Sequence, residues 1–150
     1  MTFQNTSVLI PVDGSGSAGI ALDYGLDLAE ELGLPVKIIH VLNSRPDNLE
    51  KPRRIELDDL EKFDASEHFV QLAFDAINQA RDAAGSRKLD VEYVLLVGDP
   101  AQAIVEYAGE CDRPFIVIGR RGLGPLKLLL LGSVSDKVIR HADCPVAVVN

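Results

Sequence analysis

The feature that most constrains the fold is a series of short, continuously apolar segments separated by segments of helical periodicity. A continuous apolar run fits a β-strand that is buried on both faces, because a strand with one exposed face alternates apolar and polar residues. Apolar residues that recur every three or four positions instead predict amphipathic helices. Predicted strands cover residues 8–12, 36–42, 91–97, 115–118 and 145–149.

Four predicted helices lie between these strands, and residues typical of helix ends mark their boundaries. Gly33 ends the first helix. The second helix covers residues 69–80. Asp99, with Gln102 three residues later, has the spacing of a capping box at the start of the third helix, and the last helix begins at Ser133.

The alternation of strands and helices predicts a single α/β domain over residues 1–150. We expect an open five-stranded parallel sheet in the order 3-2-1-4-5, with helices on both faces, as in Rossmann-like folds. Ligands of such sheets bind beyond the carboxyl ends of the strands, where the strand order reverses. That point lies between the first and fourth predicted strands. Residues 43–62 are rich in charge and proline, and they are predicted to form a long surface loop.

Composition argues against several classes of partner. The chain carries 23 acidic and 15 basic residues, a net charge of −8, so its field repels nucleic acids and anionic membranes. No opening segment has the pattern of a secretory signal, and no apolar run approaches the ~18 residues of a membrane span. Two cysteines without metal-ligand spacing fit a reducing compartment, so we expect a cytoplasmic protein with free thiols.

Residues 12–19, VDGSGSAG, contain the spacing G-x-G-x-x-G that occurs in dinucleotide-binding loops. That function also needs an acid at the end of the second strand to hold the ribose, and this strand ends at Asn43 without a carboxylate. The P-loop signature is absent from the sequence. We therefore interpret these glycines as a turn in which Ser15 or Ser17 caps the following helix.

A second glycine pattern follows the fourth predicted strand and carries the strongest functional signal. Its spacing is G-x2-G-x9-G-S, formed by Gly119, Gly122, Gly132 and Ser133. Glycines let backbone N–H groups approach a ligand, and the helix that begins at Ser133 adds unpaired N–H groups at the positive end of its dipole. Residues 119–133 also hold three basic side chains and no acid. The combination predicts an anion site suited to phosphate. The alternative is an ordinary connection in which Ser133 only caps the helix.

Three segments resemble the universal stress protein family: VLIPVDGS (8–15), GDPAQAI (98–104) and GRRGLGPLKLLLLGSVSDKVIRHADCPVAVV (119–149). The intact glycine pattern is similar to that of the ATP-binding subclass. The resemblance implies a Rossmann-like fold of the adenine nucleotide alpha hydrolase type. It also implies a protein that binds ATP with Mg²⁺ and acts as a nucleotide-dependent sensor or switch in the stress response, with a protein partner yet to be named. A homodimer joined through the last strand is implied as well, and the apolar edge strand at residues 145–149 favours it independently.

The resemblance further implies roles for individual residues. Adenine would be contacted by Asp13 and the backbone of Val41 and enclosed by Pro11 and Val12, the ribose by Gly119, and the phosphates by Gly122, Gly132, Ser133 and Val134, with Ser135 as a further ligand. Asp13 has two alternatives, a ligand of phosphate-bound Mg²⁺ or a residue that only stabilises a turn. Arg120 and Arg121 stand where the family often has small or polar residues, which leaves the preferred phosphate chain open.

No pairing of a nucleophile with a base is evident in the sequence. His40 lies inside a predicted strand and is interpreted as a packed side chain, and His68 is expected to be exposed. His141 closes the last helix, where a cation suits the helix dipole. We therefore expect a binding protein and not an enzyme. The alternatives are a slow ATPase and an interaction protein whose nucleotide pocket is vestigial.

Overall fold

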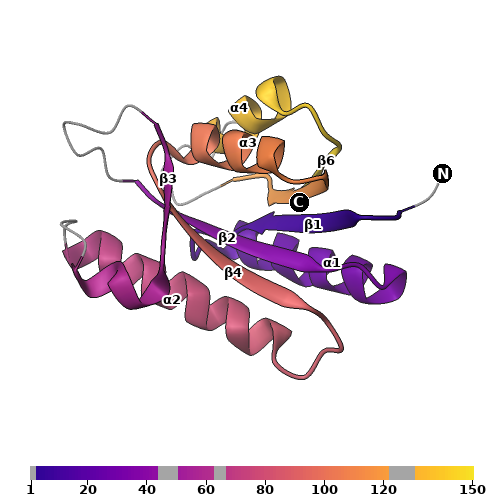
Figure 1. Cartoon of the computed structure of the whole chain (residues 1–150), viewed down its shortest axis with the longest axis horizontal. Coiled ribbons are helices and arrows are strands. Elements are labelled where there is room, and N and C mark those ends of the chain that lie inside the picture. The colour runs from indigo at the N-terminus through magenta and orange to yellow at the C-terminus, as the bar shows by residue number, and fades with distance from the viewer. Residues whose placement is uncertain (1–2, 44–50, 63–66, 122–130) are drawn as a thin grey trace.

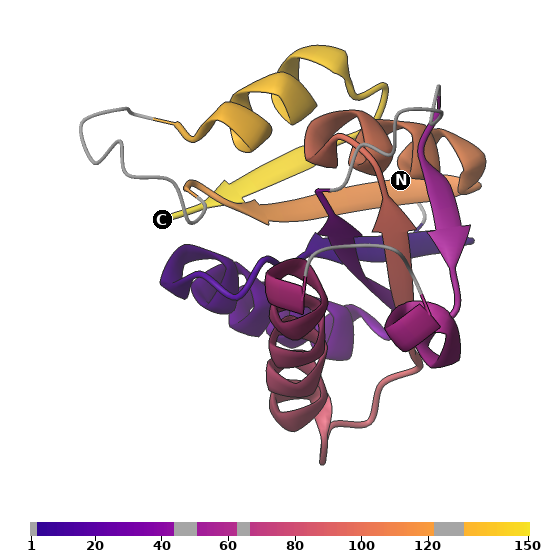
Figure 2. The same cartoon turned by 90° about the vertical axis from the view of Figure 1, so that its left-hand side faces the viewer.

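The computed structural model describes residues 3–43, 51–62, 67–121 and 131–150, in which helices cover both faces of a central sheet (Figures 1 and 2). The strands are β1 (Thr6–Pro11), β2 (Val36–Leu42), β3 (Arg53–Ile55), β4 (Val91–Val97), β5 (Arg113–Gly119) and β6 (Val146–Val149). The helices are α1 (Gly16–Leu32), the 3-10 helix η1 (Leu57–Lys62), α2 (Glu67–Ala84), α3 (Pro100–Glu110) and α4 (Ser133–His141). The strands follow the order β3-β4-β2-β1-β5-β6.

The two faces of the sheet carry different pairs of helices. Figure 1 shows α1 and α2 on one face and α3 and α4 on the other. Successive side chains of β1 point to opposite faces. Ile10 accordingly packs in one cluster with Leu26 of α1 and Ala76 of α2, whereas Leu9 packs in another with Ile104 of α3. Both strand residues are fully buried, which is why this strand has a continuous apolar sequence.

The predicted parallel sheet is confirmed, with one correction. β4, β2, β1, β5 and β6 are parallel and adjacent in the expected order. A sixth strand, β3, adds to the edge and pairs antiparallel with β4, so that Ile55 lies opposite Leu95. The prediction of a surface loop over residues 43–62 was therefore wrong for residues 53–62, since η1 also buries Leu60 completely. Residues 44–50 lie outside the described residues.

The short length of β3 explains why its sequence gives no strand pattern. Two of its three residues are arginines, and both are exposed. Arg54 Nη2 donates to Glu92 Oε1 of β4 at 2.8 Å. A charged pair across two strands thus takes the place of the apolar alternation that would have indicated a strand.

The turn that enters α1 is confirmed in detail. Ser15 Oγ accepts a hydrogen bond from Ala18 N–H at 3.1 Å and caps the helix. Gly14, just before it, has a φ of +83°, a conformation that side chains other than glycine rarely adopt. At the other end, Gly33 has the left-handed conformation of a helix terminator. The first glycine pattern is therefore a turn and a cap.

The starts of α3 and α4 differ in how they are capped. Asp99 Oδ1 accepts from Gln102 N–H at 3.0 Å, as predicted. The Gln102 side chain also donates from Nε2 to Glu106 at 2.9 Å. In α4, Ser133 is the first helical residue and Gly132 is the cap, and no side chain of the residues described here caps the helix. None of the described helices is long and apolar enough to cross a lipid bilayer.

Candidate functional site

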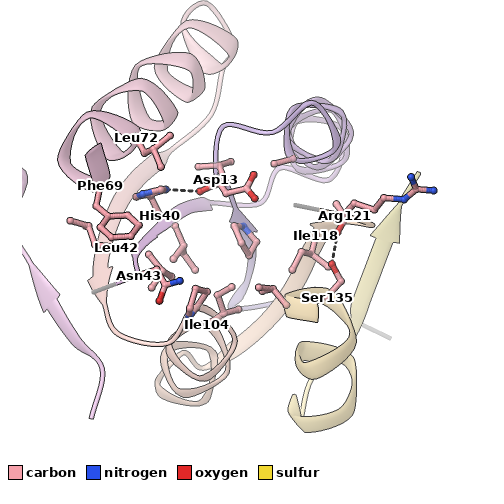
Figure 3. A pocket seen from close by; sticks show the side chains of 18 residues that line it. Asp13, His40, Leu42, Asn43, Phe69, Leu72, Ile104, Ile118, Arg121 and Ser135 are labelled. Carbon is pink, nitrogen blue, oxygen red and sulfur yellow. Dashed lines mark hydrogen bonds between the residues drawn. The ribbon is translucent and has the colours of Figure 1, made fainter. Parts of the chain in front are cut away.

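A cavity of about 230 Å³ opens beyond the carboxyl ends of β1, β2 and β5, where the strand order reverses. This is the place that the predicted topology assigned to a ligand. Figure 3 shows Phe69 and Leu72 of α2 beside His40 at one end of the cavity. Ile118 of β5 and Ser135 of α4 lie at the other end.

Most of the cavity wall is apolar. Helices from both faces of the sheet contribute to it. Its apolar residues are Pro11, Val12, Ala18, Ile39, Val41, Leu42, Phe69, Leu72, Pro100, Ile104, Ile118 and Val134, and the others are Asp13, His40, Asn43, Gly119, Arg121 and Ser135. An apolar cavity with a few polar groups suits an aromatic ring system whose edge is recognised by hydrogen bonds.

The backbone of Val41 lies at the end of the β1–β2 ladder. The paired register ends with Pro11 opposite Ile39, and Val12 N–H donates to Ile39 C=O at 2.8 Å. Alternate residues of a strand direct their backbone groups toward the same neighbouring strand. Val41, two residues after Ile39, therefore directs its N–H and C=O toward β1 but past its last paired residue, in the wall of the cavity.

His40 is buried in this wall, with only 5% of its surface exposed. Its Nδ1 lies 2.8 Å from the carbonyl oxygen of Val12, so Nδ1 carries the proton and donates. Burial lowers the pKa of His40, while the bond to Val12 and the nearby charge of Asp13 act in the opposite direction. The imidazole is therefore neutral at pH 7. It was correctly interpreted as packed, but its place in the cavity wall was not predicted.

Asp13 stabilises a turn and also lines the cavity. Its Oδ1 accepts from Ser15 N–H at 2.9 Å, which stabilises the turn between β1 and α1. The same residue lines the cavity, and Figure 3 shows its carboxylate beyond the end of β1. The turn therefore holds the carboxylate at the cavity and leaves one oxygen outside that hydrogen bond.

Gly119 is packed against the start of α1. A Cβ atom at this position would lie 2.7 Å from the carbonyl oxygen of Ser17 and 2.8 Å from its Oγ, closer than side chains tolerate. Ser17 Oγ also accepts from Arg121 N–H at 3.1 Å. The first glycine of the second pattern is therefore required by packing, whatever contact it makes with a ligand.

Two further hydrogen bonds join the end of β5 to the start of α4. Ser135 Oγ donates to Gly119 C=O at 2.6 Å, and Gly132 N–H donates to Arg120 C=O at 2.7 Å. Because its proton is engaged, the Ser135 hydroxyl can offer a ligand only a lone pair. The Arg121 side chain extends away from the cavity (Figure 3).

Seven of the predicted site residues line the cavity: Pro11, Val12, Asp13, Val41, Gly119, Val134 and Ser135. Gly132 and Ser133 lie beside Val134 at the start of α4 without lining it, and Gly122 lies outside the described residues. Sequence reasoning missed Phe69 and Leu72, because apolar residues at helical spacing look like ordinary core. The ligand contacts themselves stay predictions.

The sequence model of the universal stress protein family matches residues 4–150. The chain belongs to this family. Universal stress protein YxiE of Bacillus subtilis is 30% identical over 150 residues, which cover 95% of this chain and 97% of YxiE. A universal stress protein of Mycobacterium tuberculosis is 32% identical over 144 residues, or 95% of this chain. The chain spans only 47% of the length of that relative.

Solved structures of family members share the fold. UspA from Lactobacillus plantarum superimposes with a TM-score of 0.76 at 24% identity, covering 97% of this chain and 98% of UspA. More distant structures are complexes: one from Arabidopsis thaliana with AMP (TM-score 0.62, 20% identity), one from Archaeoglobus fulgidus with dAMP (0.64, 20%) and one with cAMP (0.59, 23%). These three cover 96–97% of this chain and 90–96% of their own.

Proposed function

We propose that this universal stress protein binds an adenine nucleotide, ATP in particular, in the cavity beyond β1, β2 and β5. One juxtaposition carries the proposal. The backbone edge of Val41 borders an apolar cavity, and the same wall reaches the N-terminus of α4, which none of the described side chains caps. An apolar cavity suits a base, and an open helix N-terminus suits phosphate. Family members solved with AMP, dAMP and cAMP support the ligand class.

Adenine complements the edge that Val41 offers. Its ring nitrogen N1 accepts a hydrogen bond and its 6-amino group donates one. The N–H and C=O of Val41 point to the same side of β2, so they can pair with both groups at once. Pro11 and Val12 would then enclose the ring, and the oxygen of Asp13 that is not bonded to Ser15 is the proposed acceptor for the second hydrogen of the amine.

The phosphates would lie toward α4. Ser133 and Val134 supply N–H groups at the positive end of this helix, whereas the Gly132 N–H donates to Arg120 C=O. The glycine pattern keeps Gly132 and Gly122 as predicted contacts. Residues 3–43, 51–62, 67–121 and 131–150 contain no group of three or more metal-ligating side chains. Mg²⁺ would therefore arrive with the phosphates, which supply most of its ligands, and Asp13 is the candidate carboxylate from the protein.

A switch fits these features better than an enzyme does. His40, the one histidine in the cavity wall described here, is held by the bond from its Nδ1 to the Val12 carbonyl, and the sequence shows no nucleophile paired with it. Phosphates bound at α4 would instead fix this helix, which leads directly into β6 at the edge of the sheet. All four residues of β6 are half-buried, and we propose that two copies of the chain pair through this edge. Nucleotide binding would then alter the surface formed by α4 and β6, to which a partner protein could bind.

Calorimetry on nucleotide-free protein tests the proposal. ATP, ADP and AMP are titrated with and without Mg²⁺, and slow turnover is followed separately. Val134→Glu places a carboxylate at the helix N-terminus in the cavity wall and should weaken ATP binding by more than about tenfold. Ile139→Glu makes the same charge change at an exposed position of α4 and should bind like the wild type. A wild-type protein that takes up no adenine nucleotide contradicts the proposal.

A further inference from the structure

One rung of the β1–β2 ladder is replaced by a side chain. The regular pattern takes Val12 N–H to Ile39 C=O, and this bond is present at 2.8 Å. The next bond of a parallel pair would take Val41 N–H to Val12 C=O. That bond is not formed among the described residues, where the pairing of β1 with β2 ends at Pro11. The Val12 carbonyl accepts from His40 Nδ1 instead.

His40 is placed to make this substitution because it lies on β2 directly before Val41. The backbone groups of alternate residues in β2 point to the same neighbouring strand. Leu42 accepts from Gly98 N–H on the β4 side, so the backbone of His40, two residues earlier, also faces β4. Its side chain stands out of the sheet on the same face as Val12 and reaches the carbonyl across the strand end. At 5% exposure it is held between strand and helix, with Leu72 of α2 beside it (Figure 3).

We propose that His40 is a positioning residue that keeps the Val41 N–H available to the ligand. By donating to the Val12 carbonyl, the imidazole directs this acceptor toward itself and away from the Val41 N–H, so the ladder does not extend by one rung. The end of β1 then stays apart from β2, and the Val41 edge borders the cavity. The inference rests on the proposed function for the identity of the ligand, but its first step concerns the protein alone.

The consequence for specificity follows from hydrogen-bond polarity. A 6-aminopurine offers an acceptor at N1, which complements a free Val41 N–H. A 6-oxopurine carries a proton at N1, so two donors would face each other. If the Val41 N–H donated to the Val12 carbonyl, the cavity could no longer use it to distinguish a 6-aminopurine from a 6-oxopurine. His40 would therefore influence the preference for the base through the Val41 N–H.

Three variants test this role. His40→Leu removes the donor and keeps an apolar side chain. His40→Asn keeps a donor, because the Asn amide nitrogen occupies about the place of His Nδ1. His141→Leu removes an exposed histidine at the end of α4 and serves as the matched control. Each variant and the wild type, over residues 1–150, are measured by amide hydrogen exchange at Val41 and by calorimetry with AMP and IMP.

In the wild type, we expect the Val41 amide to exchange readily without ligand and to become protected by AMP. In His40→Leu it should be protected without ligand, AMP affinity should fall about tenfold, and the preference for AMP over IMP should shrink. His40→Asn and His141→Leu should behave like the wild type. Protection of Val41 in the ligand-free wild type overturns the inference, as does AMP affinity in His40→Leu that equals the wild-type value.

The two proposals fail in different ways. If the wild type binds neither nucleotide, the proposed function is wrong, while the exchange rate of the Val41 amide in ligand-free wild type and variants still decides the role of His40. If His40→Leu does not fold, the exchange rate of the Val41 amide and the AMP affinity in His40→Asn and the wild type test the role of His40. A folded His40→Asn that shows a protected Val41 amide and weak AMP binding overturns the positioning role.

Discussion

Replacing Gly119 with alanine should destabilise the protein more than any other conservative change near the cavity. The added methyl group would lie 2.7 Å from the Ser17 carbonyl oxygen and 2.8 Å from both its carbonyl carbon and its Oγ. Two of these atoms are backbone in the first turn of α1, so they cannot rotate aside as a side chain does. The end of β5 would have to move away from α1.

The size of the effect follows from two contributions. Overpacking of this kind typically costs about 1–3 kcal/mol of the free energy of unfolding. The same displacement weakens the bond from Arg121 N–H to Ser17 Oγ, which adds about 1 kcal/mol. We therefore expect a loss of about 2–4 kcal/mol, and a chain of this size loses roughly 2–4 °C in Tm for each kcal/mol.

Chemical denaturation followed by circular dichroism measures this loss, with two glycine variants as references. Gly109→Ala lies on an exposed part of α3 with no atom within 4 Å of the new methyl group, and it should stabilise by up to about 1 kcal/mol. Gly25→Ala meets the Ile10 Cδ1 atom at 2.6 Å, the movable end of a side chain, and should fall between the two. Wild-type stability for Gly119→Ala would refute the packing argument.

Three other changes test separate parts of the structure. Leu60→Ala should lower the free energy of unfolding by about 2–5 kcal/mol in urea titrations, because this side chain is fully buried although its segment looks like a surface loop. Ser15→Ala should cost about 1 kcal/mol in the same assay through loss of the α1 cap. Burial lowers the pKa of His40 in the folded state, so its contribution to stability is complete above the unfolded pKa of about 6.5 and declines as pH falls toward the folded value. Unfolding free energies measured between about pH 8 and 5 should therefore show a shallower decline in His40→Asn.

The sheet could be predicted because its strands share one physical property. A parallel strand covered on both faces must be apolar at every position, as in Leu9 and Ile10, and this leaves a signal that needs no alignment. β3 has no such signal, since it is short, lies at the edge and uses Arg54 to pair with Glu92. Leu60 is a single apolar residue among charged ones, so its burial depends on contacts with distant segments.

The cavity was predictable in position and only partly in composition. The ends of the strands and the second glycine pattern located Asp13, Val41 and Gly119 correctly at one site. His40 was missed as part of its wall, and Ser17 as a residue that holds the end of β5, because their partners are backbone atoms 28 and 104 residues away in the sequence. A local sequence pattern carries no information about a contact of that range.

His40 and Ser17 both act by holding backbone groups in place, and this affects which substitutions would alter ligand binding. The proposed ligand contacts are mainly backbone groups, at Val41 and at the start of α4, and substitution of a side chain does not remove them directly. Their positions depend on side chains that hold the backbone. His40 of β2 bonds to the end of β1, and Ser17 of α1 bonds to the chain just after β5. We therefore expect nucleotide preference in this protein to respond to substitutions at such supporting residues more strongly than to substitutions at apolar residues of the cavity wall, provided that those preserve its volume.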